Sequence, residues 1–500
     1  MMMSGLVPIR MSNTIALLAL AVMLAACGDS DGGDPREPDT GGNANTGTNE
    51  GGGEDSGVGD TGGEADRMSV LLFSAYDPQS GPESLWGSDG TAEGTRRLAD
   101  ARSPDNFYRI GDTVFFTASS DETGPELWKT DGTEEGTELV KDINPGGFGS
   151  APSDLQGVGD TLYFRARVAG LTGLWRSDGT EAGTEQITGD FNAPAFLTVL
   201  DGLLYFSAST GNTVGRQLWR SDGTAQGSDI VKDFELASNG NVELLTALDG
   251  TLYFRADDGT SGSELWRSDG TESGTYMVRD INPEALEGFN PDKPENATQG
   301  SSPSNLTAFG GVLYFTASNG TQAYELWRSD GTEGGTYMVK DIDPGADSSS
   351  PRGLTAFDGA LYFVANKETD NPGLWRSDGT ESGTELVTDT SPSPRGTDYM
   401  TAFDDAIYYK ANDGTNGFEL WRSDGSEGGT LMVKDINPAV GANSSPENLT
   451  VFDGALYFSA DDGVYGRELW RSDGTEEGTE LVKDICDACD ASPRSFFAFQ

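Results

Sequence analysis

The chain has 500 residues, with 82 acidic and 32 basic side chains, so its formal net charge is −50 at neutral pH. Nucleic acid phosphates are bound by basic surfaces, and this charge therefore argues against nucleic acid as a partner. The sequence contains no histidine. Ser-His-Asp and Cys-His catalysis are excluded, and a zinc site is not expected.

Residues 1–27 have the order of an export signal. Arg10 supplies positive charge, residues 15–23 are apolar, and Leu24-Ala25-Ala26-Cys27 follow. The apolar run is too short to span a bilayer permanently. The last four residues resemble the lipobox of bacterial lipoproteins, in which the cysteine is lipidated and becomes the mature N-terminus. We therefore expect a lipoprotein signal peptide over 1–27. An ordinary signal peptide with a chance cysteine is the alternative.

The lipobox resemblance implies a membrane anchor on Cys27, because each buried methylene of an acyl chain contributes about 0.8 kcal/mol. By the same resemblance, Gly28 favours sorting to the outer membrane or surface of a bacterial cell envelope. Residues 28–67 hold eleven acidic residues, two basic residues and almost no large apolar ones. Such a segment cannot bury enough surface to offset the entropy of ordering, so we expect a disordered, acidic, Gly-rich tether.

Every tryptophan of the chain sits in one short phrase that occurs nine times. Glu126-Leu127-Trp128-Lys129-Thr130-Asp131-Gly132-Thr133 is one copy. The copies are spaced by 48 residues on average, which indicates a repeat array over 68–500. The nine tryptophans are Trp86, Trp128, Trp175, Trp219, Trp266, Trp327, Trp375, Trp421 and Trp470.

One unit can be followed from residue 243 to residue 281. Short segments rich in aromatic and β-favouring residues are separated by Asp-Gly and Ser-Asp-Gly-Thr turns. These segments are 244–248, 251–256, 264–267 and 276–281. Four antiparallel strands in one repeat, without helical periodicity, are typical of one blade of a β-propeller. The sequence therefore predicts an all-β fold.

The two ends of the array predict how it closes. Residues 68–75 align with a second strand, so the first unit lacks its first strand. Residues 492–499 align with a first strand that follows the last complete unit. We predict a single closed β-propeller of about nine four-stranded blades, in which the C-terminal strand completes the first blade. Closure removes the open edges that invite aggregation. An open β-repeat array is the alternative.

The repeated phrase resembles that of the bacterial ELWxxDGT-repeat proteins, which are also called hyalin-like. The resemblance covers essentially all of 68–500. The first copy departs at Ser84 and Gly87, and the third and seventh copies have Gly173 and Gly373 in place of the glutamate. The resemblance implies an exported repeat scaffold and no particular reaction.

An aspartate recurs in the Ser-Asp-Gly-Thr turn of every unit. It can accept hydrogen bonds from its own turn while the glycine takes a positive φ. The turn resembles the Asp-box of sialidase-type propellers, which implies a structural aspartate away from any catalytic face. A metal at each turn is the alternative. The residues are Asp89, Asp131, Asp178, Asp222, Asp269, Asp330, Asp378, Asp424 and Asp473.

A second aspartate recurs at the end of the fourth strand, usually before an Ile-Asn-Pro bend. Capping of this bend is the favoured interpretation. Calcium is the alternative, because a closed ring would place these oxygens near one face, with Asp257-Asp258-Gly259 and Asp461-Asp462-Gly463 as further ligands. No other cofactor is expected. The residues are Asp100, Asp142, Asp233, Asp280, Asp341, Asp389, Asp435 and Asp484, and the third unit has Asp190 one residue later.

The tryptophan and the residue after it also recur. A tryptophan fixed in every unit is expected in the core between blades, and an exposed platform for sugars is the alternative. In seven units an arginine follows it, which we expect to lie across the tryptophan ring or to pair with a turn carboxylate. These arginines are Arg176, Arg220, Arg267, Arg328, Arg376, Arg422 and Arg471.

Cys486 and Cys489 form the only cysteine pair after the signal. In an exported protein a local disulfide is the first expectation. It would staple the loop that leads into the closing strand.

Function is expected in what does not repeat. The loops that join strands two and three, and one blade to the next, vary in length, and the longest covers 283–304. Variable loops on a rigid frame are where recognition normally resides. We therefore expect a monomeric binding, adhesion or interaction scaffold for an extracellular glycan or protein. The alternative is a polysaccharide-active hydrolase or lyase, but no carboxylate pair stands out from the repeat.

Overall fold

The computed structural model describes residues 69–79, 81–211, 215–234, 241–283, 300–345, 347–367, 372–388, 400–487 and 489–500. The chain divides into two compact units, residues 1–64 and 65–500, and all described residues belong to the second. The predicted signal peptide, Cys27, the tether and Asp389 lie outside the described residues.

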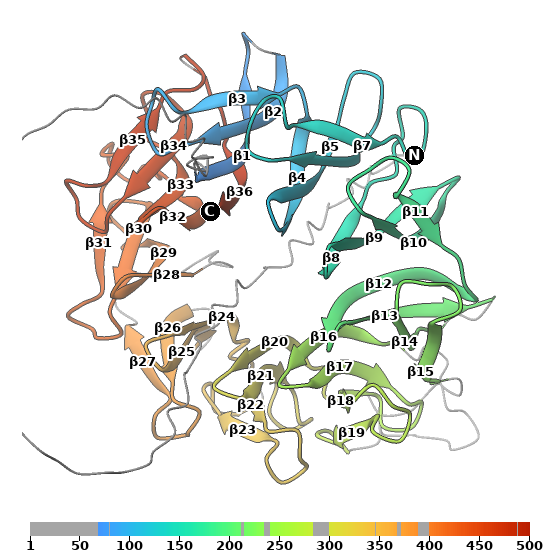
Figure 1. Ribbon diagram of the computed structural model, residues 1–500. Coiled ribbons are helices and arrows are strands. Elements are labelled where there is room, and N and C mark those ends of the chain that lie inside the picture. Colours follow the sequence, from blue (N-terminus) through green and yellow to red (C-terminus); the bar gives the residue numbers. More distant parts are fainter. Residues whose placement is uncertain are drawn as a thin grey trace, which may run out of the picture. The chain divides into compact units, whose positions relative to one another are not determined.

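The second unit consists of nine four-stranded antiparallel sheets, and the described residues contain no helix (Figure 1). Blade 1 contains β1 (Val70–Asp77), β2 (Gly81–Ser88), β3 (Arg96–Ala99) and β36 (Arg494–Phe499). Blade 2 contains β4 (Arg102–Ile110), β5 (Thr113–Ser119), β6 (Glu126–Thr130) and β7 (Glu138–Lys141). Blade 3 contains β8 (Ser153–Val158), β9 (Thr161–Val168), β10 (Leu171–Ser177) and β11 (Glu185–Ile187).

Blade 4 contains β12 (Phe191–Leu200), β13 (Leu203–Thr210), β14 (Gln217–Ser221) and β15 (Ser228–Lys232). Blade 5 contains β16 (Glu243–Leu248), β17 (Thr251–Asp257), β18 (Ser263–Ser268) and β19 (Tyr276–Arg279). Blade 6 contains β20 (Ser304–Phe309), β21 (Val312–Ala317), β22 (Glu325–Ser329) and β23 (Tyr337–Lys340).

Blade 7 contains β24 (Arg352–Phe357), β25 (Ala360–Asn366), β26 (Pro372–Ser377) and β27 (Glu385–Thr388). Blade 8 contains β28 (Thr401–Phe403), β29 (Ala406–Asn412), β30 (Phe418–Ser423) and β31 (Leu431–Lys434). Blade 9 contains β32 (Glu447–Phe452), β33 (Ala455–Asp461), β34 (Arg467–Ser472) and β35 (Glu480–Lys483).

The second and third strands of each blade are buried on both faces. In blade 5, Phe254 of β17 lies opposite Trp266 of β18, and both pack against Tyr205 of blade 4 in one apolar cluster. Eight of the nine tryptophans are less than 9% exposed, and Trp128 is partly buried. The prediction that tryptophan belongs to the core between blades is therefore confirmed.

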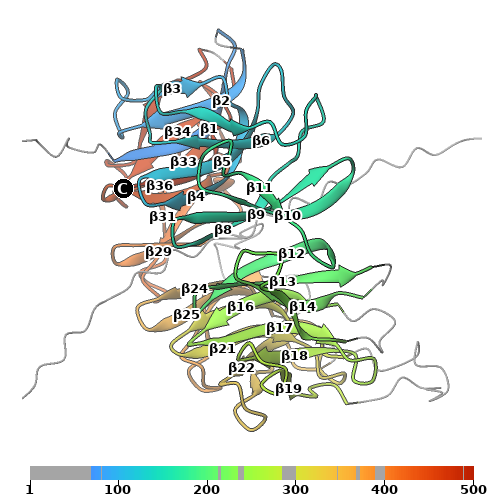
Figure 2. The same cartoon turned by 45° about the vertical axis from the view of Figure 1, so that its right-hand side comes forward.

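The ring is closed by the last strand. β36 pairs antiparallel with β1, with Leu72 opposite Phe497. The Phe496 ring meets the Phe73 ring edge-on, with 5.5 Å between centroids. Each first strand contacts the first strand of the next blade, including β36 with both β32 and β4 (Figures 1 and 2). The prediction of a nine-bladed closed propeller is confirmed, and the open array is wrong.

Basic side chains link most neighbouring blades. In four blades the arginine after the tryptophan donates to a turn carbonyl of the next blade, as Arg267 does to Gly331 at 3.1 Å. Outer-strand lysines do the same, and Lys340 Nζ lies 2.7 Å from the carbonyl oxygen of Thr384. Arg267 also lies over the Tyr276 ring.

The expected pairing of these arginines with a turn carboxylate occurs at Arg422, which pairs with Asp405 between β28 and β29. Three others, Arg176, Arg376 and Arg471, pair with a glutamate of the fourth strand of their own blade.

Removing the closing strand tests this architecture. Deletion of residues 494–500 exposes the inner edge of β1 and should lower the melting temperature sharply. The Phe496→Ala variant should lose about 2 kcal/mol, the usual contribution of burying a phenylalanine side chain. Phe148→Ala is the control, because Phe148 is 96% exposed and contacts no core. Thermal unfolding followed by circular dichroism measures all three. A deletion variant that melts with the wild type would contradict closure.

Candidate binding face

The propeller has two chemically different faces. The turns that join strands one and two, and strands three and four, lie on one face, which we call the turn face. The connections between strands two and three, and between consecutive blades, lie on the other, which we call the loop face. The turn face repeats almost unchanged from blade to blade, whereas the loop face varies in length and composition.

The turn face uses its aspartates internally. Asp269 Oδ1 accepts hydrogen bonds from the Thr271 amide at 2.9 Å and the Thr271 hydroxyl at 2.7 Å, and Gly270 has a φ of 84°. The hydroxyl and amide hydrogen bonds lower the pKa of Asp269 below its ordinary value. The same pair of bonds forms in all nine turns, with Ser426 in place of threonine at Asp424. One oxygen of each turn aspartate is thus committed to its own turn.

Five members of the second aspartate set keep one carboxylate oxygen without a bond to the bend that follows. Among the described residues, the buried Oδ1 atom has no hydrogen-bond partner in Asp142, Asp280, Asp341, Asp435 and Asp484. Asp100 instead pairs with Arg97, and Asp233 follows β15 in blade 4. No three His, Cys, Asp or Glu side chains gather as a metal site in the described part of the chain. Each of these aspartates belongs to a separate blade.

The further oxygens considered as calcium ligands are also engaged locally. Asp258 Oδ1 accepts from the Thr260 and Ser261 amides of its own loop, at 2.9 and 2.8 Å. Burial raises the pKa of Asp280, and the charge of Asp258 raises it further. The two carboxylates are therefore near enough to repel one another.

A buried glutamate holds the bend that the aspartate was expected to cap. Glu264, in the Glu-Leu-Trp phrase of blade 5, accepts hydrogen bonds from the amides of Ile281 at 3.2 Å and Asn282 at 3.3 Å. It also accepts from the Ser301 amide at 2.8 Å and the Ser301 hydroxyl at 2.5 Å. Ser301 precedes the first strand of blade 6, so one carboxylate organises the connection between two blades. Sequence reasoning missed this role, although the glutamate recurs in the phrase.

Five blades share this arrangement, and none of the five carboxylates reaches solvent. Burial raises the pKa of each one, to about 7 for Glu264 and to about 8 for Glu468. Gln217 takes the position in blade 4 and accepts from the Phe234 amide. Because they are sealed, these carboxyls cannot touch a substrate. The five residues are Glu126, Glu264, Glu325, Glu419 and Glu468, each 0% exposed.

Cys486 and Cys489 lie in the connection between β35 and β36. Their Cα atoms are 5.2 Å apart, and the structure joins them as a disulfide. The Cys489 amide also donates to the Cys486 carbonyl at 2.8 Å. The pair therefore forms a tight loop directly before the closing strand.

Exposed large apolar side chains gather on the loop face. Seven of the twelve among the described residues lie in its connections or at the strand ends beside them. Four others, Tyr276, Tyr337, Leu431 and Val451, lie at strand ends beside the turns of the opposite face, and Ile230 lies within β15. Val464 and Tyr465 belong to blade 9, Val440 to the connection before it, and Tyr76 to the next blade. The other three of the seven are Phe148, Leu171 and Tyr324. The repeat does not require these residues, so they are candidates for contact with a partner.

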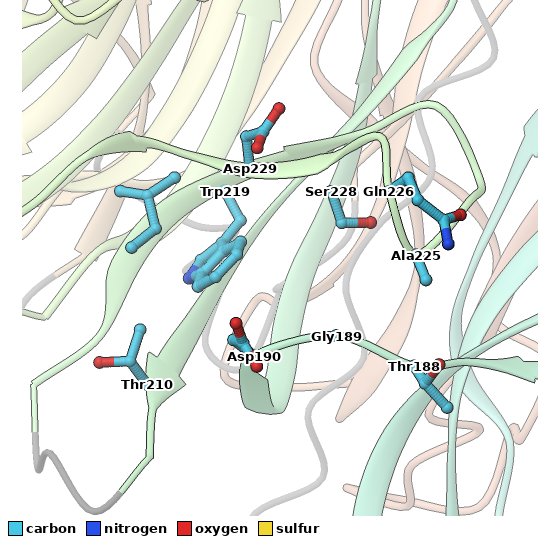
Figure 3. Close-up of a pocket in the computed structure, with 10 residues that line it drawn as sticks. Thr188, Gly189, Asp190, Thr210, Trp219, Ala225, Gln226, Ser228 and Asp229 are labelled. Atoms are coloured by element: carbon cyan, nitrogen blue, oxygen red, sulfur yellow. The ribbon is translucent and has the colours of Figure 1, made fainter.

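A hollow of about 670 Å³ lies between blades 3 and 4. It forms where β11 is only three residues long. In the view of Figure 3, Asp190 and Asp229 lie on either side of the Trp219 ring. Trp219 is only 4% exposed, and its indole N–H donates to the Ala208 carbonyl at 3.2 Å. The hollow therefore offers polar rims and little aromatic surface.

Only the two ends of the long 283–304 loop belong to the described residues. Among the described residues, no helix has the length and apolar character needed to cross a bilayer.

No protein-family model matches the chain, and no curated protein matches it. Solved structures that it resembles include a puromycin hydrolase, with 14% identity, 72% of this chain covered, 59% of that chain covered and a TM-score of 0.38. A puromycin-hydrolyzing peptidase from Mycobacterium tuberculosis has 11% identity, 69% and 56% coverage and a TM-score of 0.39. The chain thus spans less than two thirds of either structure. Similarity at this level carries no inference about activity.

The buried glutamates predict how stability depends on pH. The pKa values of Glu264 and Glu468 in the folded protein, about 7 and about 8, lie above the ordinary value of 4.5. Their contribution to the free energy of unfolding is therefore complete below about pH 4.5 and is lost as the pH rises through about 7 to 8. We expect the wild type to lose more stability between about pH 5 and about pH 9 than the Glu264→Gln, Glu468→Gln variant, by on the order of 1 kcal/mol per site. Denaturant unfolding across this pH range measures the difference.

The control for this experiment is Glu93→Gln, Glu272→Gln, which removes the same charge from exposed positions. It separates local burial from the general self-repulsion of an acidic protein. Equal pH dependence in all three proteins would contradict the raised pKa values.

Proposed function

We propose that this protein is a non-enzymatic, exported scaffold that binds a glycan or protein partner through its loop face. The observation that carries the proposal is the gathering of exposed apolar side chains on connections that the repeat leaves free to vary. An apolar side chain in water gains free energy when a partner covers it. A rigid frame that presents variable loops is a common basis for recognition.

The chemistry of the carboxylates supports binding over catalysis. A glycosidase needs two carboxyl groups that face the same bound sugar, one of them with a raised pKa. Here the five glutamates with raised pKa are fully buried and accept backbone hydrogen bonds. The turn aspartates accept hydrogen bonds within their own turns. Hydrolysis or cleavage of a polysaccharide is therefore the outcome that would displace the proposal.

The sequence supplies the proposed location. The resemblance of residues 24–27 to a lipobox, and of the array to the ELWxxDGT-repeat proteins, both imply export. A lipid on Cys27 would hold the propeller at a bacterial envelope, with residues 28–67 as the tether. The propeller would then act as a lipid-anchored monomer whose loop face meets an extracellular partner.

The anchor can be tested separately from binding. The Cys27→Ser protein should lose lipid attachment and partition into the aqueous phase after detergent extraction, because no acyl chain would remain to insert in the bilayer. Metabolic labelling with a fatty acid gives a second readout. Labelled, detergent-partitioning Cys27→Ser protein would refute the lipoprotein assignment.

The loop face can be tested with a matched pair of variants. Val464→Ser, Tyr465→Ser removes two exposed apolar side chains from the loop face, and we expect a partner captured from envelope glycans or proteins to bind at least about tenfold more weakly, or about 1.4 kcal/mol. Leu431→Ser is the control, because Leu431 is similarly exposed but begins an outer strand. Biolayer interferometry measures both. Product release from a polysaccharide, abolished by one Asp or Glu substitution, would establish an enzyme instead.

A further inference from the structure

The loop-face ends of the inner strands carry basic side chains that no repeat position predicts. In every blade, one residue of the second strand lies opposite the leucine of the Glu-Leu-Trp phrase. In blades 3, 5 and 8 this residue is basic: Arg165, Arg255 and Lys410 lie opposite Leu174, Leu265 and Leu420. We call this second-strand residue, together with the first-strand residue that pairs with it, the inner row. The basic fourth-strand residues that also pair with the leucine, such as Lys141 and Lys340, belong to the outer strand and donate to carbonyls of the neighbouring blade.

In two further blades the first strand supplies the basic group of the inner row. Arg352 of β24 lies opposite Val364 of β25 in blade 7. Arg494 of β36 lies opposite Ser74 of β1 in blade 1. The second-strand residue of these blades is Val364 or Ser74, and the basic residue stands on the first strand, at the position that pairs with it.

In blades 4 and 9 an arginine at the start of the third strand reaches the inner row with its side chain: Arg216 directly precedes β14, and Arg467 begins β34. The second-strand residues are Ser207 and Ser459, and an arginine three residues before the tryptophan reaches back to them. Arg216 Nε lies 2.9 Å from the Ser207 hydroxyl, and its Nη2 lies 3.1 Å from the Ser207 carbonyl. Arg467 Nη1 contacts the Ser459 carbonyl at 3.3 Å and the Ser459 hydroxyl at 3.4 Å. Two blades thus place a guanidinium at the same level by the same device.

Seven of the nine blades therefore present one cation in the inner row, and these side chains form what we call the cationic ring. Blades 2 and 6 have Thr117 and Thr316 at the second-strand position instead. Because consecutive first strands contact one another around the propeller, the ring follows their loop-face ends. Its members are Arg165, Arg216, Arg255, Arg352, Lys410, Arg467 and Arg494.

The ring is only partly neutralised. Its carboxylate partners are Asp154 with Arg165, Glu243 with Arg255, Glu83 with Arg494, and Glu447 with Lys410 and Arg467. Asp105 adds a carboxylate to the row of blade 2. Within the described residues Arg216 and Arg352 make no ion pair; Arg216 donates to the carbonyls of Ala193 and Ser207, and Arg352 to the carbonyl of Ser350. The ring and its immediate partners thus comprise seven cations and five carboxylates, and the aspartates after the fourth strands, such as Asp280 and Asp484, add further carboxyl groups to the same face.

Arg216 shows how one of these cations is held. Burial lowers its pKa, and the nearby charge of Arg165 lowers it further. Glu243 and Asp154 act in the opposite direction but do not pair with it directly. Arg216 therefore holds its charge with hydrogen bonds to Ser207 and the Ala193 carbonyl and, in the part of the chain that the structure describes, without a directly paired carboxylate.

We propose that the cationic ring binds the anionic groups of an acidic glycan, either uronate carboxylates or sulfate esters. The planar guanidinium matches both groups through two parallel hydrogen bonds. Cations in the consecutive blades 3, 4 and 5 suit a linear chain that carries charges at regular intervals. Exposed Tyr76, Tyr324 and Tyr465 on the same face offer stacking surfaces for sugar rings, which favours a glycan over an acidic peptide. The inference rests on the proposed function and names its ligand class.

The test uses the full chain with four probes: alginate as a polyuronate, dextran sulfate, neutral dextran and polyglutamate. Affinity electrophoresis should show retardation by alginate or dextran sulfate, none by dextran, and weaker binding at about 200 mM than at about 50 mM salt. The Arg216→Gln, Arg352→Gln variant lacks two cations of the ring and should therefore bind the anionic glycans at least about tenfold more weakly than the wild type. Arg96→Gln, on exposed outer strand β3, is the control and should bind within about twofold of the wild type.

A second variant keeps the test decisive if the arginine variants lose stability. Thr316→Lys adds a cation to the inner row of blade 6, at the position that Lys410 holds in blade 8, and should tighten binding of the anionic glycans. Retardation that none of these substitutions changes would overturn the ring while leaving loop-face binding intact. Binding of polyglutamate alone would overturn the glycan assignment, and failure to bind any probe would overturn the proposal. Release of product from alginate would instead overturn the non-enzymatic function on which it rests.

Discussion

The second and third strands of each blade are apolar on both faces, and this constraint governs the rest of the molecule. A blade such as β16–β19 buries Phe254 and Trp266 against blade 4, and Tyr253 and Leu265 against blade 6. A terminal blade in an open array would leave one such surface in water, at about 25 cal/mol for each Å² exposed. Ring closure by β36 removes both the exposed surface and the unpaired edge of β1. The repeat sequence therefore requires a partner on either side of every blade.

When apolar blades pack side by side, the backbone amides and carbonyls buried between them need hydrogen-bond partners. The connection from one blade to the next places several amides where water cannot reach, and an unpaired buried amide is costly. A single glutamate such as Glu264 accepts three amides and one hydroxyl at this point. The desolvation that this arrangement requires opposes the gain, which is why the pKa is raised. Gln217, Ser84, Gly173 and Gly373 show that a blade can form without the carboxylate.

Repetition explains which features the sequence could predict. The strands, the tryptophan core and the closing strand recur at fixed positions, so each copy reinforces the assignment of the others. The role of the glutamate was missed because its donors are 17 to 37 residues away, as Ile281 and Ser301 are from Glu264. The aspartate beside the bend was given that role on proximity alone. A side chain that caps a bend far away in the sequence produces no local spacing pattern from which its role could be predicted.

The cationic ring could not be predicted from the sequence, for a different reason. Its members come from the first strand in Arg352, the second strand in Arg255 and the residue before the third strand in Arg216, so an alignment of the repeats places them in different columns. The pairing register brings Arg352 and Arg255 to one level, and the side chain of Arg216 reaches that level through its contacts with Ser207. A residue that the core or the backbone requires occurs at one fixed position of the repeat. A charge that is required only at one level of the blade can come from any adjacent strand. A cation that is maintained at one level while its column changes is therefore better explained by a requirement on charge than by the packing of a blade.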